Sequence, residues 1–218
     1  MTNLRINWLE RALKSIWQQW QFYQLADQRF GYMFDYEPVK EWVALDCETT
    51  GLSIQNDEII SIGAVKIVDN RILTSERLEL IVRSKKKVST QSMKIHRLRE
   101  MEVAQGLSPE VAMEKLIEFI GSRPLVGYYL EFDIAMINKT LKPMLGIGLP
   151  QSKIEVSSLY YDYKNNQLPH HEKDRDIDLR FSTIMKDLKL PTRAAHDAMN
   201  DAVMAAMAFI KLRELIST

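Results

Sequence analysis

The spacing of apolar residues changes partway along the chain, and this change restricts the fold strongly. Residues 42–45, 58–68 and 72–82 are short runs rich in Val, Ile and Leu, which is typical of strands with at least one buried face. Helical spacing of apolar residues follows in four later stretches: 109–120, 132–145, 179–188 and 197–216. A short apolar run at 124–127 predicts one more strand, and the polar stretch from Tyr163 to Asp178 predicts a loop. The order β-β-β-α-β-α, with mostly helix after it, predicts an α/β fold in which helices cover a mixed sheet.

The first 38 residues differ from the rest and predict a separate extension. Their apolar residues recur every three or four positions, which predicts an amphipathic helix that ends near Gly31. The residues of this stripe are Ile6, Leu9, Leu13, Ile16, Trp20 and Tyr23. Because Pro38 then precedes the first strand, we predict an extension over residues 1–38 and a main domain over residues 39–218. We expect Trp8, Trp17 and Trp20 to be buried, either on the protein's own core or in a homodimer, with a different protein partner as the alternative.

Composition excludes several classes of protein. The chain has 29 basic and 29 acidic residues, so no overall charge attracts nucleic acid or a membrane, and any such partner has to be met locally. Its single cysteine, Cys47, cannot form an intrachain disulfide, and no apolar run approaches the roughly 18 residues of a membrane span. Charged residues interrupt the N-terminus, where a signal peptide would be apolar. These features predict a cytoplasmic protein without a membrane partner.

Two acids at the end of the first strand are candidate site residues. Residues 45–52 read LDCETTGL, and the side chains of a strand alternate, so Asp46 and Glu48 share one face with Cα atoms about 6.6 Å apart. Cys47 then points to the opposite face. A solvated strand face would show the same alternation, but the run before Asp46 is apolar on both faces, and the Thr-Thr-Gly that follows ends the strand. The pair therefore emerges where a buried strand opens onto a cleft.

Two later stretches carry the other candidates. Asp133 stands where a short strand passes into a helix, and by itself it is equally consistent with a helix N-cap. His196 and Asp201 are five positions apart, a difference of about 140° around a helix, so they converge only if His196 precedes the helix. Asp197 as the N-cap would put it there. A lone histidine in such a place also has a purely structural interpretation.

Taken together, residues 45–52, 126–138 and 195–202 resemble, in this order, the three motifs of the DEDDh family of DnaQ-like 3′-to-5′ exonucleases. The resemblance covers roughly residues 42–209, and it includes the proofreading subunits of bacterial replicative polymerases. It implies a ribonuclease-H-like fold with a mixed five-stranded sheet, whose first three strands form the meander. The histidine spacing disfavours the tyrosine variant of the superfamily. Each family ligand has a counterpart in this chain: Asp46, Glu48, Asp133, Asp201 and His196.

The resemblance implies a chemistry in which two divalent ions, Mg²⁺ or Mn²⁺, act on a phosphodiester. Asp46 would bridge both ions, Glu48 and Asp201 would bind the ion on the nucleophile side, and Asp133 would support the other. His196 would accept a proton from the attacking water. Four clustered carboxylates repel one another, and oxygen ligands suit Mg²⁺ or Mn²⁺, so the residues themselves are consistent with this chemistry.

Substrate contacts follow from the same resemblance. Thr49 and Leu52 would lie near the terminal nucleotide, as would Ile95 and His96, and we add Phe132 of the F-D motif. Tyr128 and Tyr129 replace the family's His-Asn, and a tyrosine there can stack on a base or simply fill space. The basic residues of 83–99 could neutralise phosphates or form a solvated loop.

These observations predict a metal-dependent 3′-to-5′ exonuclease that releases nucleoside monophosphates from single-stranded DNA. Two alternatives stay open. One is an exoribonuclease of the same family, because both groups use the same metal ligands. The other is a nucleic-acid-binding module without turnover, which the intact acids and histidine disfavour.

Overall fold

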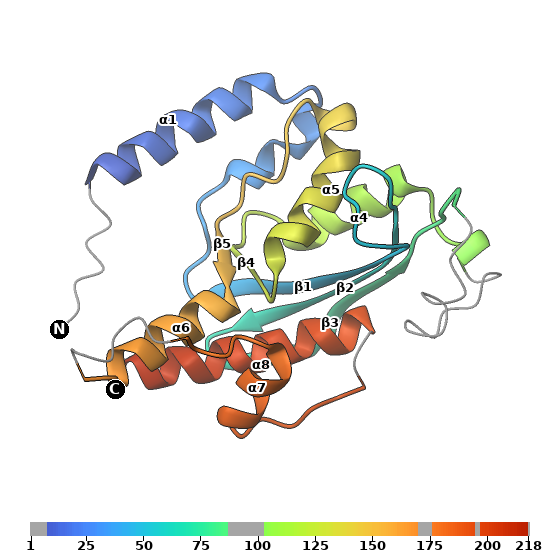
Figure 1. The fold of residues 1–218 in the computed structure, drawn as a ribbon. Helices are drawn as coiled ribbons and strands as arrows, with labels where there is room; N and C mark the ends of the chain where they lie inside the picture. Colours follow the sequence, from blue (N-terminus) through green and yellow to red (C-terminus); the bar gives the residue numbers. More distant parts are fainter. Residues whose placement is uncertain (1–7, 87–102, 170–175, 195–196, 218) are drawn as a thin grey trace.

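The centre of the protein is a sheet that combines antiparallel and parallel strands (Figure 1). A computed structural model describes residues 8–86, 103–169, 176–194 and 197–217. Within these residues five strands pair in the order β3-β2-β1-β4-β5. The strands are β1 (Glu41–Thr49), β2 (Ile59–Val68), β3 (Arg71–Ile81), β4 (Leu125–Gly127) and β5 (Lys153–Glu155). The helices are α1 (Trp8–Gln24), the 3-10 helix η1 (Gln28–Phe34), α4 (Pro109–Ile120), α5 (Leu130–Leu145), α6 (Val156–Gln167), α7 (Phe181–Asp187) and α8 (Ala198–Ser217).

The predicted meander and fold class are confirmed. Strand β2 runs antiparallel to both β1 and β3, whereas β4 runs parallel to β1 and β5 runs parallel to β4. The first three strands are long and joined by short connections, which favours antiparallel neighbours, while β4 and β5 each follow a helix or a long connection.

Helices cover both faces of the sheet (Figure 1), and the residues of β1 alternate between the two. Val43, Leu45 and Cys47 belong to the apolar core shared with α4 and α5. Ala44 lies in the second core, which α6, α7 and α8 form with the opposite face. This alternation puts Asp46 and Glu48 on the face covered by α8.

The N-terminal helix ends with its apolar stripe and not at the glycine that was expected to mark its end. The expected end near Gly31 is wrong, because α1 ends at Gln24 and η1 begins at Gln28. Asp27 explains the break: its carboxylate accepts a hydrogen bond from the Arg29 backbone N–H and so caps η1, not a continued α-helix.

The predicted burial of the tryptophans on the protein's own core is wrong for the two whose side chains are described. Trp17 is 45% exposed and Trp20 is 59% exposed. The buried apolar side chains among the described residues at this end of the chain are instead Leu25, Phe30 and Met33, which join the core of α4 and α5. The division at residue 38 stays a prediction, although these three residues pack into the main core.

The exposure of Trp20 leads to a prediction on stability. Trp20→Gln should change the free energy of unfolding by no more than about 0.5 kcal/mol, since the side chain contributes little to the core. Leu25→Ala, five residues away, should lower it by about 2–5 kcal/mol because it leaves a cavity. Urea denaturation measures both.

The same two variants test whether a second copy or another protein binds this helix. Both kinds of partner stay predictions. A loss above 2 kcal/mol for Trp20→Gln, with a molar mass that falls to the 25.4 kDa of one chain, would mean that a second copy covers this face.

The sequence did not predict two elements that follow β4 in the chain, β5 and α6. Strand β5 has three residues, too few to show alternation, and α6 extends to Gln167, so the predicted loop from Tyr163 is wrong over its first five residues. Helix α6 buries only Val156 and Tyr160, which explains its weak apolar pattern. None of the described helices is both long and apolar enough to cross a membrane.

Candidate active site

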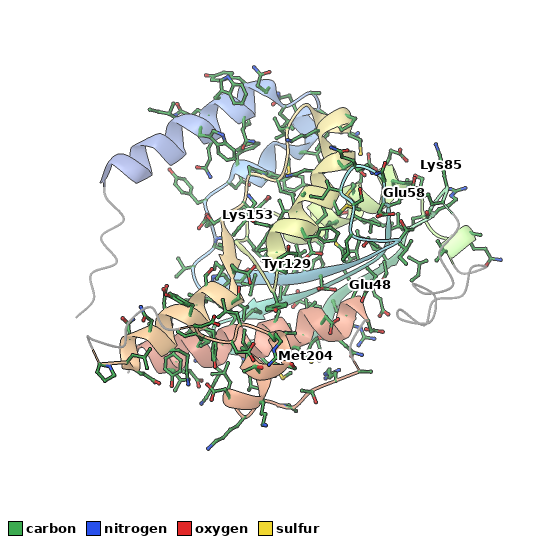
Figure 2. The ribbon with its side chains drawn as sticks, viewed as in Figure 1. Glu48, Glu58, Lys85, Tyr129, Lys153 and Met204 are labelled. Atoms are coloured by element: carbon green, nitrogen blue, oxygen red, sulfur yellow. The ribbon has the colours of Figure 1, made fainter. Side chains whose placement is uncertain are left out.

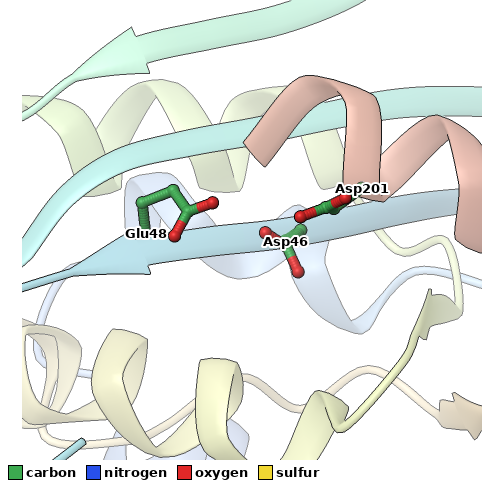
Figure 3. Close-up of side chains that lie close together, drawn as sticks. All are labelled: Asp46, Glu48 and Asp201. Atoms are coloured by element: carbon green, nitrogen blue, oxygen red, sulfur yellow. The ribbon is translucent and has the colours of Figure 1, made fainter. Parts of the chain in front are cut away.

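Three acids from two elements meet on the α8 side of the sheet (Figure 3). Among the described residues, Asp46, Glu48 and Asp201 each offer an oxygen within 4.8 Å of the others. Asp46 and Glu48 come from β1, and Asp201 comes from the first turn of α8. Two unit charges at this separation repel by about 3 kcal/mol at an effective dielectric of 20. Such a cluster is therefore suited to hold a cation.

A glycine opposite Asp46 allows α8 to approach the sheet. Gly63 of β2 pairs with Asp46, and a Cβ atom built on it would lie 2.3 Å from the backbone carbon of Ala198. The first residues of α8 thus rest directly on the backbone of β2. Sequence reasoning missed Gly63, although an isolated glycine within a run of Ile and Val often marks a close backbone approach.

Asp197 ends the preceding loop and begins α8, as predicted. Its carboxylate accepts a hydrogen bond of 2.9 Å from the Asn200 N–H, and its carbonyl oxygen accepts one of 2.9 Å from the Asp201 N–H. The cap fixes the first turn of the helix and with it the position of Asp201. The predicted general base, His196, lies outside the described residues.

Asp133 approaches the site from α5, and its interpretation as an N-cap is wrong. The N-cap of α5 is Tyr129, four residues earlier. The Asp133 side chain is 4% exposed, and its Oδ1 accepts a hydrogen bond of 3.1 Å from the backbone N–H of Cys47. That N–H is available because the β1–β4 pairing ends at Ala44 and Val126, before it reaches Cys47. The short β4 therefore allows an acid to bind where a longer strand would pair.

Burial and repulsion from neighbouring carboxylates raise the pKa values of Asp46 and Asp133. The pKa of Asp46 lies well above its usual value, mainly because the surrounding protein shields most of its carboxyl group from water. The nearby carboxylates of Asp133, Asp201 and Glu48 raise it further. Burial likewise raises the pKa of Asp133, against the effect of the Cys47 N–H. A bound cation would favour the charged forms of both. The pKa of the Cys47 thiol is also raised by burial, so this cysteine is not an activated nucleophile.

The predicted substrate contacts differ in exposure. Thr49 is buried, and its hydroxyl donates to the Gly51 carbonyl oxygen at 2.7 Å. Leu52 is 85% exposed and Tyr129 is 70% exposed, so both are available to a ligand. The Phe132 ring stacks beside that of Tyr129, with centroids 6.4 Å apart. Ile95 and His96 lie outside the described residues, and the roles of all six stay predictions.

The described part of the basic stretch is engaged with neighbouring acids. The Lys86 ammonium lies 3.2 Å from the Asp57 carboxylate, and the backbone N–H groups of Lys85 and Lys86 donate to Glu58. These contacts tie the stretch to the loop that follows β1. They favour a structural role for Lys86 over contact with phosphate.

Comparison with known proteins finds an exonuclease family model and relatives among DNA polymerase III proteins. Residues 43–209 match the family model RNase_T, whose description is exonuclease. The PolC-type DNA polymerase III of Caldanaerobacter subterraneus is 31% identical over 178 residues, which cover 80% of this chain and 12% of that polymerase. DNA polymerase III subunit epsilon of Aquifex aeolicus is 25% identical over 173 residues, which cover 79% of this chain and 80% of the subunit. The chain thus spans only a small part of the PolC-type relatives.

Solved structures share the fold. Exonuclease X in complex with 5′ overhanging duplex DNA aligns with a TM-score of 0.59 and 23% identity, over 81% of this chain and 93% of that one. E. coli exonuclease I in complex with a dT13 oligonucleotide aligns with a TM-score of 0.64 and 15% identity, over 80% of this chain and 41% of that one.

Proposed function

The chain belongs to the exonuclease family, and on that premise we propose that it is a metal-dependent 3′-to-5′ exonuclease. It would release nucleoside monophosphates from the 3′ ends of single-stranded DNA. The observation that carries this proposal is the cluster of Asp46, Glu48 and Asp201 on one face of the sheet, with Asp133 beside it.

The donor atoms of this cluster fit hard divalent cations. All are carboxylate oxygens, which suit Mg²⁺ or Mn²⁺ better than a softer metal. We propose two ions, with Asp46 contributing to both, Glu48 and Asp201 to one, and Asp133 to the other. When bound, such a pair activates water and stabilises the departing 3′ oxygen of a phosphodiester.

The chain's own groups would orient the substrate and move the proton. His196 stands immediately before Asp197, the cap of α8, and so close in sequence to Asp201. Its neutral imidazole, with a reference pKa near 6.5, would accept the proton of the attacking water. Thr49 and Leu52, which follow the acids on β1, would position the terminal nucleotide. The buried Thr49 hydroxyl is held by Gly51, and the exposed Leu52 is free to contact a base.

The choice of DNA rests on the relatives. The sequence relatives named above are DNA polymerase III proteins, and E. coli exonuclease I, which shares the fold, has been solved with a DNA oligonucleotide. A ribose 2′-hydroxyl is the feature that would separate RNA from DNA at the site.

One assay tests activity, direction, sugar and metal together. DNA and RNA strands of matched sequence, labelled at the 5′ end, are incubated with Mg²⁺, with Mn²⁺ or with a chelator. We expect a ladder of shortened, still-labelled DNA products with either metal and none with chelator. Immediate release of the labelled nucleotide would contradict the direction, and preferential loss of RNA would replace DNA as the substrate. Binding of both strands without shortening would point to a module without turnover.

A further inference from the structure

A groove runs along α5, the helix that carries Asp133. It has a volume of about 830 Å³ and lies between this helix and the tip of the loop that joins β1 to β2. Its lining includes Gln55, Tyr129, Phe132, Lys142 and Lys153, with Glu131 as the one acid. The groove thus combines aromatic rings with three lysines, because Lys139 also lines it.

Tyr129 lines the groove four residues before Asp133, and hydrogen bonds fix its backbone. Its backbone has a φ of 58°, in the left-handed region that a residue with a side chain rarely adopts. The Glu155 carboxylate holds this conformation, since it accepts hydrogen bonds from the N–H groups of Tyr129 at 3.1 Å and Leu130 at 2.8 Å. The backbone of this exposed residue is therefore fixed, and Figure 2 shows Tyr129 between Lys153 and Glu48 in this view. Unusual backbone conformations of this kind concentrate at binding sites.

The opposite wall of the groove is attached to the catalytic strand. The ammonium of Lys139 donates to the carbonyl oxygens of Gln55 at 2.9 Å and Asp57 at 2.8 Å. It thereby joins α5 to the loop that begins where β1 ends. A strand in the groove would lie in a defined position relative to Asp46 and Glu48.

The lysines lie farther along the same groove. Phe132 and Lys142 are ten residues apart on α5, a distance of about 15 Å along the axis. This length exceeds what one nucleotide would occupy. Lys153 starts β5 on the same side, with its ammonium 3.2 Å from the Gln151 carbonyl oxygen and its side chain exposed to solvent. Aromatic platforms combined with cations are how proteins bind single-stranded nucleic acid without sequence preference.

We propose that this groove binds the DNA strand on the 5′ side of the nucleotide being removed. A base stacks on Tyr129, and Lys142 and Lys153 contact backbone phosphates. The proposal rests on the function proposed above, and it adds a site for the part of the substrate that is not cut.

Binding of 5′-fluorescein-labelled dT12 tests it, with Ca²⁺ in place of Mg²⁺ so that the strand is not consumed. Lys142→Gln/Lys153→Gln should raise the Kd about 10-fold and reduce the slope of log Kd against log salt by about 1.4, which is the loss of two phosphate contacts on a single strand. Tyr129→Ala should raise the Kd about 10-fold, whereas Tyr129→Phe should retain the stacking and the affinity. The matched control is Lys115→Gln/Lys186→Gln, which removes the same charge from exposed positions of α4 and α7 and should change neither quantity.

Activity supplies an independent readout. The ratio of kcat/KM for dT12 to that for the dinucleotide dT2 should fall about 10-fold in Lys142→Gln/Lys153→Gln, because only the longer strand reaches these lysines. If the wild-type protein shortens dT12 but the groove variants keep its Kd and this ratio, the groove proposal is overturned and the exonuclease function stands. If the wild-type protein cuts neither strand, the exonuclease function fails, and the Kd values still decide whether the groove binds DNA.

Discussion

Asp46→Asn is expected to lower kcat about 1000-fold and, at the same time, to stabilise the protein without metal. The residue is the one acid proposed to contact both ions, and losing several kcal/mol of transition-state stabilisation corresponds to a rate loss of this size. Asparagine has the same shape but no charge, so it relieves the repulsion among acids whose oxygens lie within 4.8 Å of one another. In a chelator we expect Tm to rise by about 4 °C, or roughly 1–2 kcal/mol.

The sign of the pH dependence follows from the raised pKa of Asp46. In the unfolded chain the Asp46 carboxyl group titrates near pH 3.9, and in the folded protein it keeps its proton to a higher pH. The favourable contribution of the protonated form is complete below pH about 3.9 and disappears as the pH rises through the folded-state pKa. The Tm advantage of Asp46→Asn over wild type should therefore grow between pH 5 and pH 8.

Three measurements check this prediction: the rate of single-stranded DNA hydrolysis, Tm in a chelator at pH 5 and at pH 8, and the rise of Tm on adding Mg²⁺. The wild-type Tm should rise with Mg²⁺, and that of Asp46→Asn should rise much less. Asp162→Asn makes the same change at an exposed position of α6 and should behave as wild type. An Asp46→Asn protein that is less stable in a chelator, or that still gains stability from Mg²⁺, would contradict the proposed site.

Gly63→Ala is expected to lower kcat about 100-fold although it adds only one methyl group. The new Cβ would lie 2.3 Å from the Ala198 backbone carbon and 2.4 Å from the Met199 nitrogen, against an ordinary contact of about 3.5 Å. Since these are backbone atoms, no side chain can turn away, and the start of α8 has to move by about 1 Å. Asp201 moves with it, and a displacement of this size can reduce turnover about 100-fold.

Overpacking should also lower the free energy of unfolding by about 1–3 kcal/mol, so activity is compared at a temperature where circular dichroism shows the variant to be folded. Gly31→Ala serves as the control. Its added Cβ would lie 3.4 Å from a ring carbon of Phe22, an ordinary contact, and we expect wild-type kcat. A folded Gly63→Ala protein with wild-type kcat would mean that α8 does not need this close approach.

Local features of the sequence predicted much of the fold. Helix α4 begins and ends where its apolar spacing does, and the two long hairpin partners β2 and β3 were evident from their Ile and Val content. Strand β1 proved longer than the apolar run 42–45, because Asp46 and Glu48 belong to it. An acid within a strand reduces the apolar signal even where the backbone stays paired with a neighbour, as Asp46 and Glu48 do with β2.

Whether the apolar face of a helix is buried was harder to predict from the sequence. The stripe of Ile16, Trp20 and Tyr23 is apolar, but these side chains are exposed among the described residues. Periodicity shows that a helix has an apolar face, whereas the neighbouring element that covers it depends on how distant segments pack. The three residues of β5 give no periodic signal at all, and they pair because β4 offers an open edge.

The sequence alone determined the order of the elements, the alternation that puts Asp46 and Glu48 on one face, and the cap by which Asp197 begins α8. These depend on interactions between residues close together in the chain, whose spacing can be read directly. The tertiary structure alone decided which α8 residues meet β1, the approach that Gly63 permits, and the exposure of Tyr129. Those features depend on distances between segments far apart in sequence, which are set by the packing of the whole core.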